Sequence, residues 1–236
     1  MRRTFAILAL AVLAGCSDRS AQSVDPRVAD ASRPLVFLTH PTEPPCSYTN
    51  EAGAVVGTDV DLARRIAAKM GRELVVESVR FSEILPRLKA GTADFGIATI
   101  TITEARSRDV DFSAPYTFGG ACFLYRSTDP KPRMSQSAML SVGVEAETVE
   151  DIYLCRHGGD PQRFNHLADA MAALENKDID VVLFDVLPLK KIADESHGRF
   201  SITPLVTRDG YGVAVDKRRP DVLAAANAVI AEGGAK

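Results

Sequence analysis

The residues best suited to chemistry lie at 99–106, where the sequence reads TITITEAR. Thr99 and Thr101 are two residues apart, so on a strand their hydroxyl groups would share one face. Thr103 has the side chain of a helix N-cap, and Arg106 follows it in the first turn of the expected helix. Hydroxyl groups, free backbone N–H groups and a guanidinium together can hold a carboxylate. The same pattern also suits a plain strand followed by a surface arginine.

A second candidate is Asp185, which closes the apolar segment IDVVLFD. A carboxylate at the carboxyl end of a strand faces the ligand crevice of an open α/β sheet, but it can also cap the helix that follows. The loop HPTEPPC adds His40, Glu43 and Cys46. A metal site from these three is conceivable. Their spacing matches no standard ligand pattern, however, so we expect no metal and no cofactor.

These side chains need a scaffold, and strand-like and helix-like segments alternate along the chain. Alternation of this kind predicts an α/β fold in which helices cover parallel sheets. The first series contains strand segments at 34–38, 73–81 and 93–100 and helix segments at 58–71 and 82–91. A second series starts at 140, after a polar interruption rich in proline, and predicts a second α/β lobe.

The N-terminus predicts export. Arg2 and Arg3 precede an apolar run that is too short to span a bilayer, and the run ends in LAGC at 13–16. This resembles the lipobox of bacterial lipoproteins, which implies cleavage before Cys16 and its acylation. An ordinary signal peptide or a short anchor helix is the alternative. We therefore expect a signal peptide at 1–15 and a protein tethered by lipid in the periplasm or at the cell surface.

Composition excludes other classes of function. Hydrophobic residues make up 46% of the chain and charged residues 25%, as in ordinary globular proteins, so disorder is not expected. The formal net charge is -3, and no basic stripe with interleaved aromatic residues occurs. Nucleic acid is therefore not an expected partner.

Three segments carry a resemblance to a known family: GTDVDLARRIAAKMG, FSEILPRLKAGTADFGIATITITEARSRDVDFSAPY and DVVLFD. In order and spacing they resemble the amino-acid-type (family 3) solute-binding proteins of ABC transporters. The resemblance implies a periplasmic-binding-protein-like fold of type II, with two α/β lobes, two crossover segments and a ligand cleft between the lobes. It implies a polar tether at 16–33, a first lobe at 34–125 plus 207–236, and a second lobe at 126–206.

The resemblance also implies roles for single residues. Arg106 matches the arginine that grips the ligand α-carboxylate, with the Thr101 hydroxyl and the Thr99 backbone as further donors. The Ala98 carbonyl and the Asp185 carboxylate match the groups that receive the α-ammonium.

Three further matches are less regular. Phe81 matches the aromatic residue that packs on the ligand side chain, although a core role is also open. Thr148 matches the start of a helix that meets the ligand carboxylate, but EAETVED stands where a Gly-Thr-Thr-like turn is usual. In the loop where the family has an acidic and an aromatic residue this chain has His40 and Glu43, which are additional ligand-binding candidates.

The resemblance implies a monomeric binding protein that captures an amino acid or a similar zwitterion and delivers it to an ABC permease. Catalysis is not expected. The alternatives are an enzyme on the same scaffold, similar to cyclohexadienyl or prephenate dehydratases, and a sensor that docks a partner protein. For the enzyme, Glu43, Glu147 and Glu150 would be the candidate acids.

Overall fold

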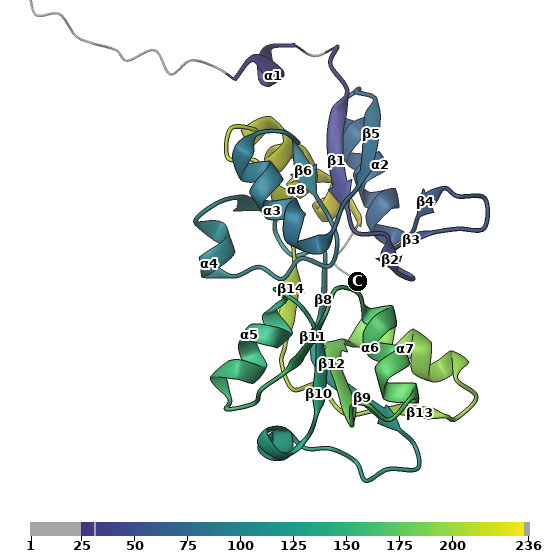
Figure 1. The fold of residues 1–236 in the computed structure, drawn as a ribbon. Coiled ribbons are helices and arrows are strands. Elements are labelled where there is room, and N and C mark those ends of the chain that lie inside the picture. Colours follow the sequence, from purple (N-terminus) through teal and green to yellow (C-terminus); the bar gives the residue numbers. More distant parts are fainter. Residues whose placement is uncertain (1–24, 31, 234–236) are drawn as a thin grey trace, which may run out of the picture.

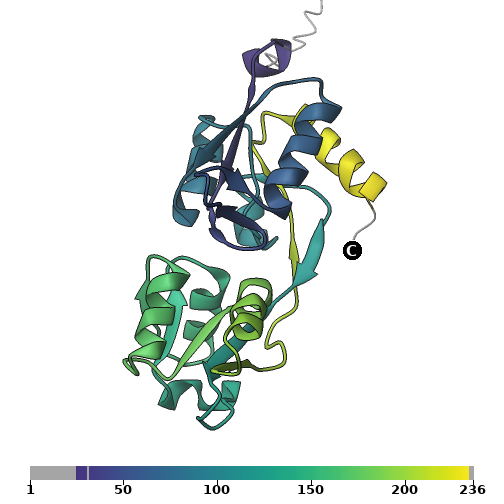
Figure 2. The same cartoon turned by 90° about the vertical axis from the view of Figure 1, so that its right-hand side faces the viewer.

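The computed structural model describes residues 25–30 and 32–233, and in it the chain forms two lobes joined by two extended segments (Figures 1 and 2). The first lobe holds both the early and the last elements of the chain, and the second lobe is built from the middle (Figure 1). The fold is thus the two-lobed α/β architecture that the sequence predicts.

The sheet of the first lobe has the strand order β5-β1-β6-β15-β7. Strand β1 runs parallel to β5 and β6, and β15 runs antiparallel to β6 and β7. Side chains alternate between the two faces of β1. Leu35 and Phe37 therefore pack toward α2 and α8, while Leu38 packs toward α3 on the other face. The elements are β1 (Leu35–Thr39), α2 (Thr58–Lys69), β5 (Leu74–Ser78), α3 (Phe81–Ala90), β6 (Phe95–Gly96), β7 (Asp111–Phe112), β15 (Ala214–Val215) and α8 (Pro220–Gly233).

The sheet of the second lobe has the order β11-β10-β12-β9-β13, with β10, β11 and β12 parallel and β9 antiparallel to its neighbours. Helix α5 packs on one face of this sheet, and α6 and α7 pack on the other. The elements are β9 (Ala121–Arg126), the 3-10 helix η1 (Met134–Met139), β10 (Val142–Glu145), α5 (Val149–Arg156), β11 (Gln162–Phe164), α6 (Leu167–Glu175), β12 (Val181–Asp185), α7 (Val186–Glu195) and β13 (Phe200–Ile202).

The two lobes are joined where β8 (Thr117–Gly119) pairs with β14 (Asp209–Tyr211). This crossover comes before the lobe boundary expected at 125, because the whole of β9 belongs to the sheet of the second lobe. A small sheet of β2 (Thr42–Glu43), β3 (Ser47–Thr49) and β4 (Val55–Val56), together with the short helix α4 (Glu104–Ser107), projects from the first lobe.

The described N-terminal segment, which falls within the expected tether, packs against the first lobe. Helix α1 (Pro26–Ala29) lies at the end of this lobe that is remote from the second lobe (Figure 1). Arg27 is buried and pairs with Asp25 at 2.7 Å and with Asp216 at 2.5 Å. The expected signal peptide and Cys16 lie outside the described residues. Within the described part of the chain, no helix has the length and apolar character needed to cross a membrane.

The crossover segments that join the lobes form the hinge, and Gly120 in this hinge leaves no room for a side chain. This predicts the effect of a substitution. Its φ is +143°, and a Cβ atom there would lie 2.3 Å from the Thr207 carbonyl oxygen on the other crossover segment. We expect Gly120→Ala to lower the free energy of unfolding by about 3 kcal/mol, because both strain and overlap oppose it. Denaturant unfolding measures this loss.

Gly53→Ala is the matched control, since Gly53 also has positive φ (+77°) but no heavy atom within 4 Å of the added methyl group. It should cost only about 1 kcal/mol. Equal losses in the two variants would show that close approach of the crossover segments does not constrain the hinge.

Candidate functional site

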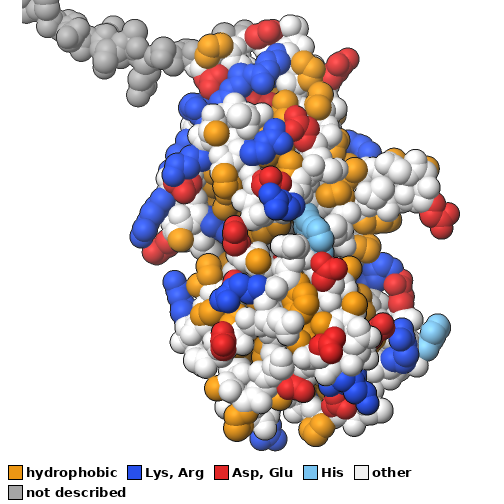
Figure 3. Space-filling view, in the orientation of Figure 1, with side chains coloured by type: hydrophobic (Ala, Val, Ile, Leu, Met, Phe, Trp, Pro, Cys, Tyr) orange, Lys and Arg blue, Asp and Glu red, His pale blue; other side chains and the backbone are white. Residues whose placement is uncertain are grey.

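A cleft lies between the two lobes, and it is lined by every residue for which the sequence predicts a role in ligand binding. In the space-filling view the lobes meet along most of the visible seam (Figure 3). The cleft is lined by His40, Glu43, Cys46, Ser47, Asp59, Phe81, Ala98, Thr99, Thr101, Arg106, Glu145, Thr148, Val149, Glu150, Phe184 and Asp185. The parts that these residues play in binding remain predictions.

The backbone at Thr99 differs from the expected strand. Regular strand structure ends with β6, and Thr99 has a left-handed φ of +46°. Its N–H donates to the buried carboxylate of Asp59 at 3.2 Å, and the Tyr116 hydroxyl donates to the other oxygen of Asp59 at 3.0 Å. The Thr99 N–H, which the resemblance implies as a donor to the ligand, thus has Asp59 as its partner in this structure. Thr101 continues the segment through an isolated bridge to Tyr211.

Arg106 lies in the first turn of a short helix, as the sequence predicts. The Thr103 side chain caps α4 by accepting from the Arg106 N–H at 3.2 Å. The guanidinium donates through Nη1 to the Thr101 carbonyl at 3.0 Å, and its carbon lies 5.4 Å from the centre of the Phe81 ring. Burial lowers the pKa of Arg106. Among the described residues, no carboxylate forms an ion pair with it, which leaves N–H groups for an anion in the cleft.

Asp185 comes from the second lobe, at the carboxyl end of β12. Its carboxylate accepts a short hydrogen bond from the Tyr211 hydroxyl, and the same hydroxyl accepts from the Gly120 N–H at 2.9 Å. Its side chain makes no capping hydrogen bond to α7, so the alternative role as a helix cap is not observed. Burial raises the pKa of Asp185 to about 7. This carboxyl group is thus held in place by Tyr211, a residue of a crossover segment, and a positive charge beside it would favour its ionised form.

A further carboxyl group, that of Glu150, stands at the start of α5. The Thr148 hydroxyl caps this helix, accepting from the Asp151 N–H at 3.3 Å and donating to the Glu145 carbonyl at 2.9 Å. Glu150 follows in the first turn, is buried, and has one carboxyl oxygen with no hydrogen-bond partner in the described structure. Burial, together with the charge of Asp185, raises the pKa of Glu150 to about 8.

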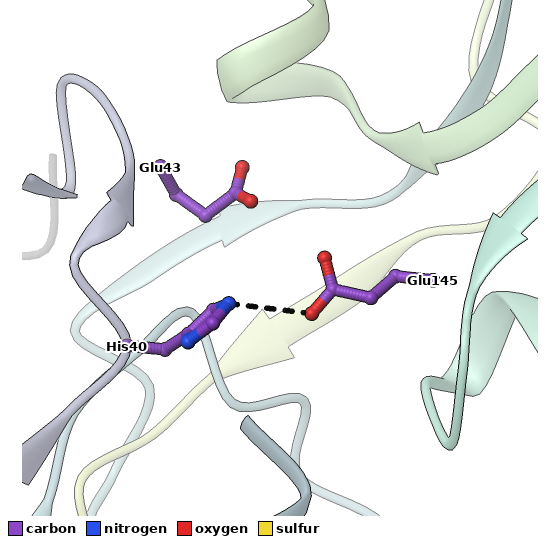
Figure 4. Close-up of side chains that lie close together, drawn as sticks. All are labelled: His40, Glu43 and Glu145. Atoms are coloured by element: carbon purple, nitrogen blue, oxygen red, sulfur yellow. Dashed lines mark ion pairs between the residues drawn. The ribbon is translucent and has the colours of Figure 1, made fainter. Parts of the chain in front are cut away.

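A third group of side chains, His40, Glu43 and Glu145, converges from both lobes (Figure 4). His40 follows β1, Glu43 belongs to β2 and Glu145 ends β10. His40 Nε2 lies 3.4 Å from Glu145 Oε1. Glu43 is buried, and this burial, reinforced by the charge of Glu145, raises the pKa of Glu43 to about 8.

The sequence predicts no binding role for Asp59 or Glu145, and it offers Glu150 only as a candidate acid. Glu145 shows the same sequence pattern as Asp185, since both are acidic residues at the end of an apolar parallel strand. The expectation that such residues face the ligand crevice applies equally to Glu145. Asp59 stands in the first turn of α2, where an acidic residue usually interacts with the helix dipole. Nothing in the local sequence shows that Asp59 reaches the backbone of Thr99.

Comparison with known proteins places this geometry in a family. A family model of the bacterial extracellular solute-binding proteins, family 3, matches residues 35–235. The chain belongs to this family. Solved structures of its relatives share the type II periplasmic-binding-protein fold. The arginine-bound form of truncated ArgBP from T. maritima has a TM-score of 0.80 and 30% identity, over 85% of this chain and 96% of that chain.

Two curated relatives of this family 3 protein cover most of its length. The arginine-binding periplasmic protein of Mannheimia haemolytica is 25% identical over 86% of both chains. The L-cystine-binding protein TcyJ of Escherichia coli strain K12 is 27% identical over 96% of this chain and 87% of its own. These relatives are solute-binding proteins, and this chain is accordingly a binding protein of the amino-acid-binding periplasmic family and not an enzyme.

The raised pKa of Glu150 predicts how stability depends on pH. Its pKa lies above the ordinary value of 4.5, at about 8, so its protonated form favours the folded chain and this contribution is lost as the pH rises toward 8. We expect the free energy of unfolding of the ligand-free protein to fall between about pH 5.5 and pH 8. In Glu150→Gln, which cannot ionise, we expect the fall to be smaller by about 1 kcal/mol or more.

Denaturant unfolding at the two pH values measures this difference, and Glu104→Gln is the control because Glu104 is exposed in α4. The control should follow the unsubstituted protein. If Glu150→Gln loses as much stability as the unsubstituted protein, the carboxyl group of Glu150 does not take up a proton on folding.

Proposed function

We propose that this protein captures an amino acid in the cleft between its lobes and delivers it to an ABC permease. The observation that carries the proposal is the opposition of Arg106 on the first lobe and Asp185 on the second, both lining one cleft. An α-amino acid carries a carboxylate and an ammonium on the same carbon, so it can engage both groups at once. Because the two groups lie on different lobes, such a ligand stabilises the closed form more than the open one.

The α-carboxylate is assigned to Arg106. Its guanidinium has no carboxylate partner among the described residues, and the buried Thr101 side chain lies beside it in the cleft. Charge-assisted hydrogen bonds from a guanidinium are strong and geometrically selective for a carboxylate. The start of α5 is a weaker partner than the family pattern implies, because Glu150 places its own carboxyl group there.

The α-ammonium is assigned to Asp185, with the Ala98 carbonyl as a second acceptor. An ammonium group adds an ionic partner to this buried carboxylate, which accepts a hydrogen bond from the Tyr211 hydroxyl. This pairing replaces the proton that burial favours on Asp185. Phe81 packs beside Arg106 and forms an apolar wall of the cleft.

The rest of the cleft limits the side chain of the ligand. Asp59, Glu43, Glu145 and Glu150 are all buried carboxyl groups of this cleft, so a ligand with a negatively charged side chain is disfavoured. A neutral or positively charged side chain is compatible with them. Relatives named for arginine and cystine support such a ligand.

The location proposed for the protein is extracytoplasmic. Membership of a periplasmic solute-binding family supports it. Anchoring through an acylated Cys16 follows from the lipobox-like sequence, and we propose that the anchored protein acts as a monomer beside its permease.

Loss of the guanidinium tests the proposed function. We expect L-amino acids to raise the melting temperature of the unsubstituted protein, with a stabilisation of about 2.7 kcal/mol at a ligand concentration one hundred times Kd. Arg106→Ala should weaken binding at least about 100-fold, because two charge-assisted hydrogen bonds to the carboxylate are lost. A thermal-shift screen of L-amino acids, followed by calorimetry, measures both effects.

Arg108→Ala is the matched control, since Arg108 is exposed two residues further along and lines a neighbouring hollow, not the cleft that holds Asp185. It should bind as the unsubstituted protein does. The proposal is wrong if no amino acid stabilises the protein, or if Arg106→Ala and Arg108→Ala bind the same amino acid equally well.

A further inference from the structure

His40, Glu43 and Glu145 form a second group of converging donors, separate from the amino-acid clamp, by which we mean Arg106 and Asp185. One donor atom from each lies within 4.8 Å of the donor atoms of the other two. All three side chains are more than nine-tenths buried, with exposures of 4%, 7% and 4%. Figure 4 shows the three side chains pointing toward one another, with His40 and Glu43 from the first lobe and Glu145 from the second.

The histidine is oriented as a metal ligand. His40 Nδ1 lies 3.0 Å from the Val79 carbonyl oxygen, which can only accept, so Nδ1 carries the hydrogen. The other nitrogen, Nε2, is left to face the two carboxylates. Metal-binding histidines have this arrangement, in which a backbone carbonyl holds one ring nitrogen and fixes the lone pair of the other.

The carboxylates have unused acceptors that face the same point. Glu43 Oε2, Glu145 Oε2 and His40 Nε2 have no hydrogen-bond partner in the described part of the structure. Glu43 receives a hydrogen bond only on Oε1, from the Thr42 hydroxyl at 3.2 Å. Buried polar atoms without partners are costly, and a cation among them would satisfy all three. Once the ion has displaced the protons that these groups hold, two carboxylates and a neutral imidazole match the charge of a divalent ion.

We propose that His40, Glu43 and Glu145 bind a divalent transition-metal ion of the zinc type, which bridges the two lobes. The 3.4 Å between His40 Nε2 and Glu145 Oε1 supports this, because two donors about 2.1 Å from a tetrahedral zinc ion lie about 3.4 Å apart. Rotation of the Glu43 side chain brings the third donor to the ion. A fourth coordination position is left toward the cleft, as in zinc sites that keep one open position.

The donor set also selects among cations. Calcium prefers six or more oxygen ligands, and magnesium prefers an octahedral shell rich in water. Three donors that include an imidazole, in a buried place, suit neither ion. An imidazole with two carboxylates suits zinc and its neighbours in the first transition row.

Titration calorimetry with Zn²⁺ on the chelator-treated, reduced protein tests this site, and the visible absorption of Co²⁺ reports the coordination. We expect one equivalent of Zn²⁺ to bind, and Mg²⁺ and Ca²⁺ not to compete. Glu145→Gln and Glu43→Gln should each weaken Zn²⁺ binding at least about tenfold, and the Co²⁺ spectrum should change. Each substitution replaces a charged ligand with a neutral side chain of similar shape. Circular dichroism and melting curves verify that both variants are folded.

Two control variants separate this site from other donors. Cys155→Ser removes an exposed thiol, and Glu83→Gln removes a carboxylate of α3 outside the cleft. Both should bind Zn²⁺ as the unsubstituted protein does. Arg106→Ala should also retain Zn²⁺ binding while losing the amino acid, so failure of the metal site and failure of the proposed function are distinguishable.

The metal assignment is overturned if the unsubstituted protein does not bind Zn²⁺, or if Glu43→Gln and Glu145→Gln bind it unchanged. One further result would replace it. If Zn²⁺ fails to bind while L-lysine or L-arginine binds and loses affinity in Glu43→Gln, the three residues hold the charged end of the ligand instead.

Discussion

The structure depends on one electrostatic constraint, which is the number of buried carboxyl groups that line the cleft between the lobes. Five of them line the cleft, at Glu43, Asp59, Glu145, Glu150 and Asp185, whereas the basic side chains there are Arg106 and His40. Like charges about 4 Å apart repel by several kcal/mol at the effective dielectric of a protein. The closed form must therefore hold protons on some of these groups, as their raised pKa values indicate, or gain positive charge from what it binds. This constraint favours a closed state that is stabilised by its ligand.

Tyr211 connects this constraint to the hinge. Its backbone pairs with Thr101 beside Arg106, while its hydroxyl hydrogen-bonds to Asp185 and to the Gly120 N–H. One residue of a crossover segment thus contacts the segment of the first lobe that precedes Arg106 and the Asp185 carboxylate of the second lobe. A change in the hinge angle must alter these contacts together. The distance between Arg106 and Asp185 therefore depends on the geometry of the segments that join the lobes.

The predictability of each part depends on how local its cause is. Arg106 could be placed because the N-cap Thr103 lies three residues away, and Asp185 because a buried strand ends at it. The left-handed backbone of Thr99 could not be predicted, since the Asp59 carboxylate that holds it lies 40 positions earlier in the chain. The spacing of His40, Glu43 and Cys46 predicts no metal site because the cause is again not local. The proposed third ligand, Glu145, comes from the other lobe, and spacing within one loop cannot reveal it.

The two proposed ligands are connected through closure, although they use different residues. An amino acid held by Arg106 and Asp185, and a metal ion held by His40, Glu43 and Glu145, each join groups from both lobes. Each therefore favours the same closed form. When one ligand has already stabilised that form, the other binds without spending binding free energy on closing the lobes. By thermodynamic linkage, the factor by which the metal ion raises the affinity for the amino acid equals the factor by which the amino acid raises the affinity for the metal. A cleft with excess buried carboxylate is suited to such coupling, because each added positive charge lowers the cost of closing the lobes.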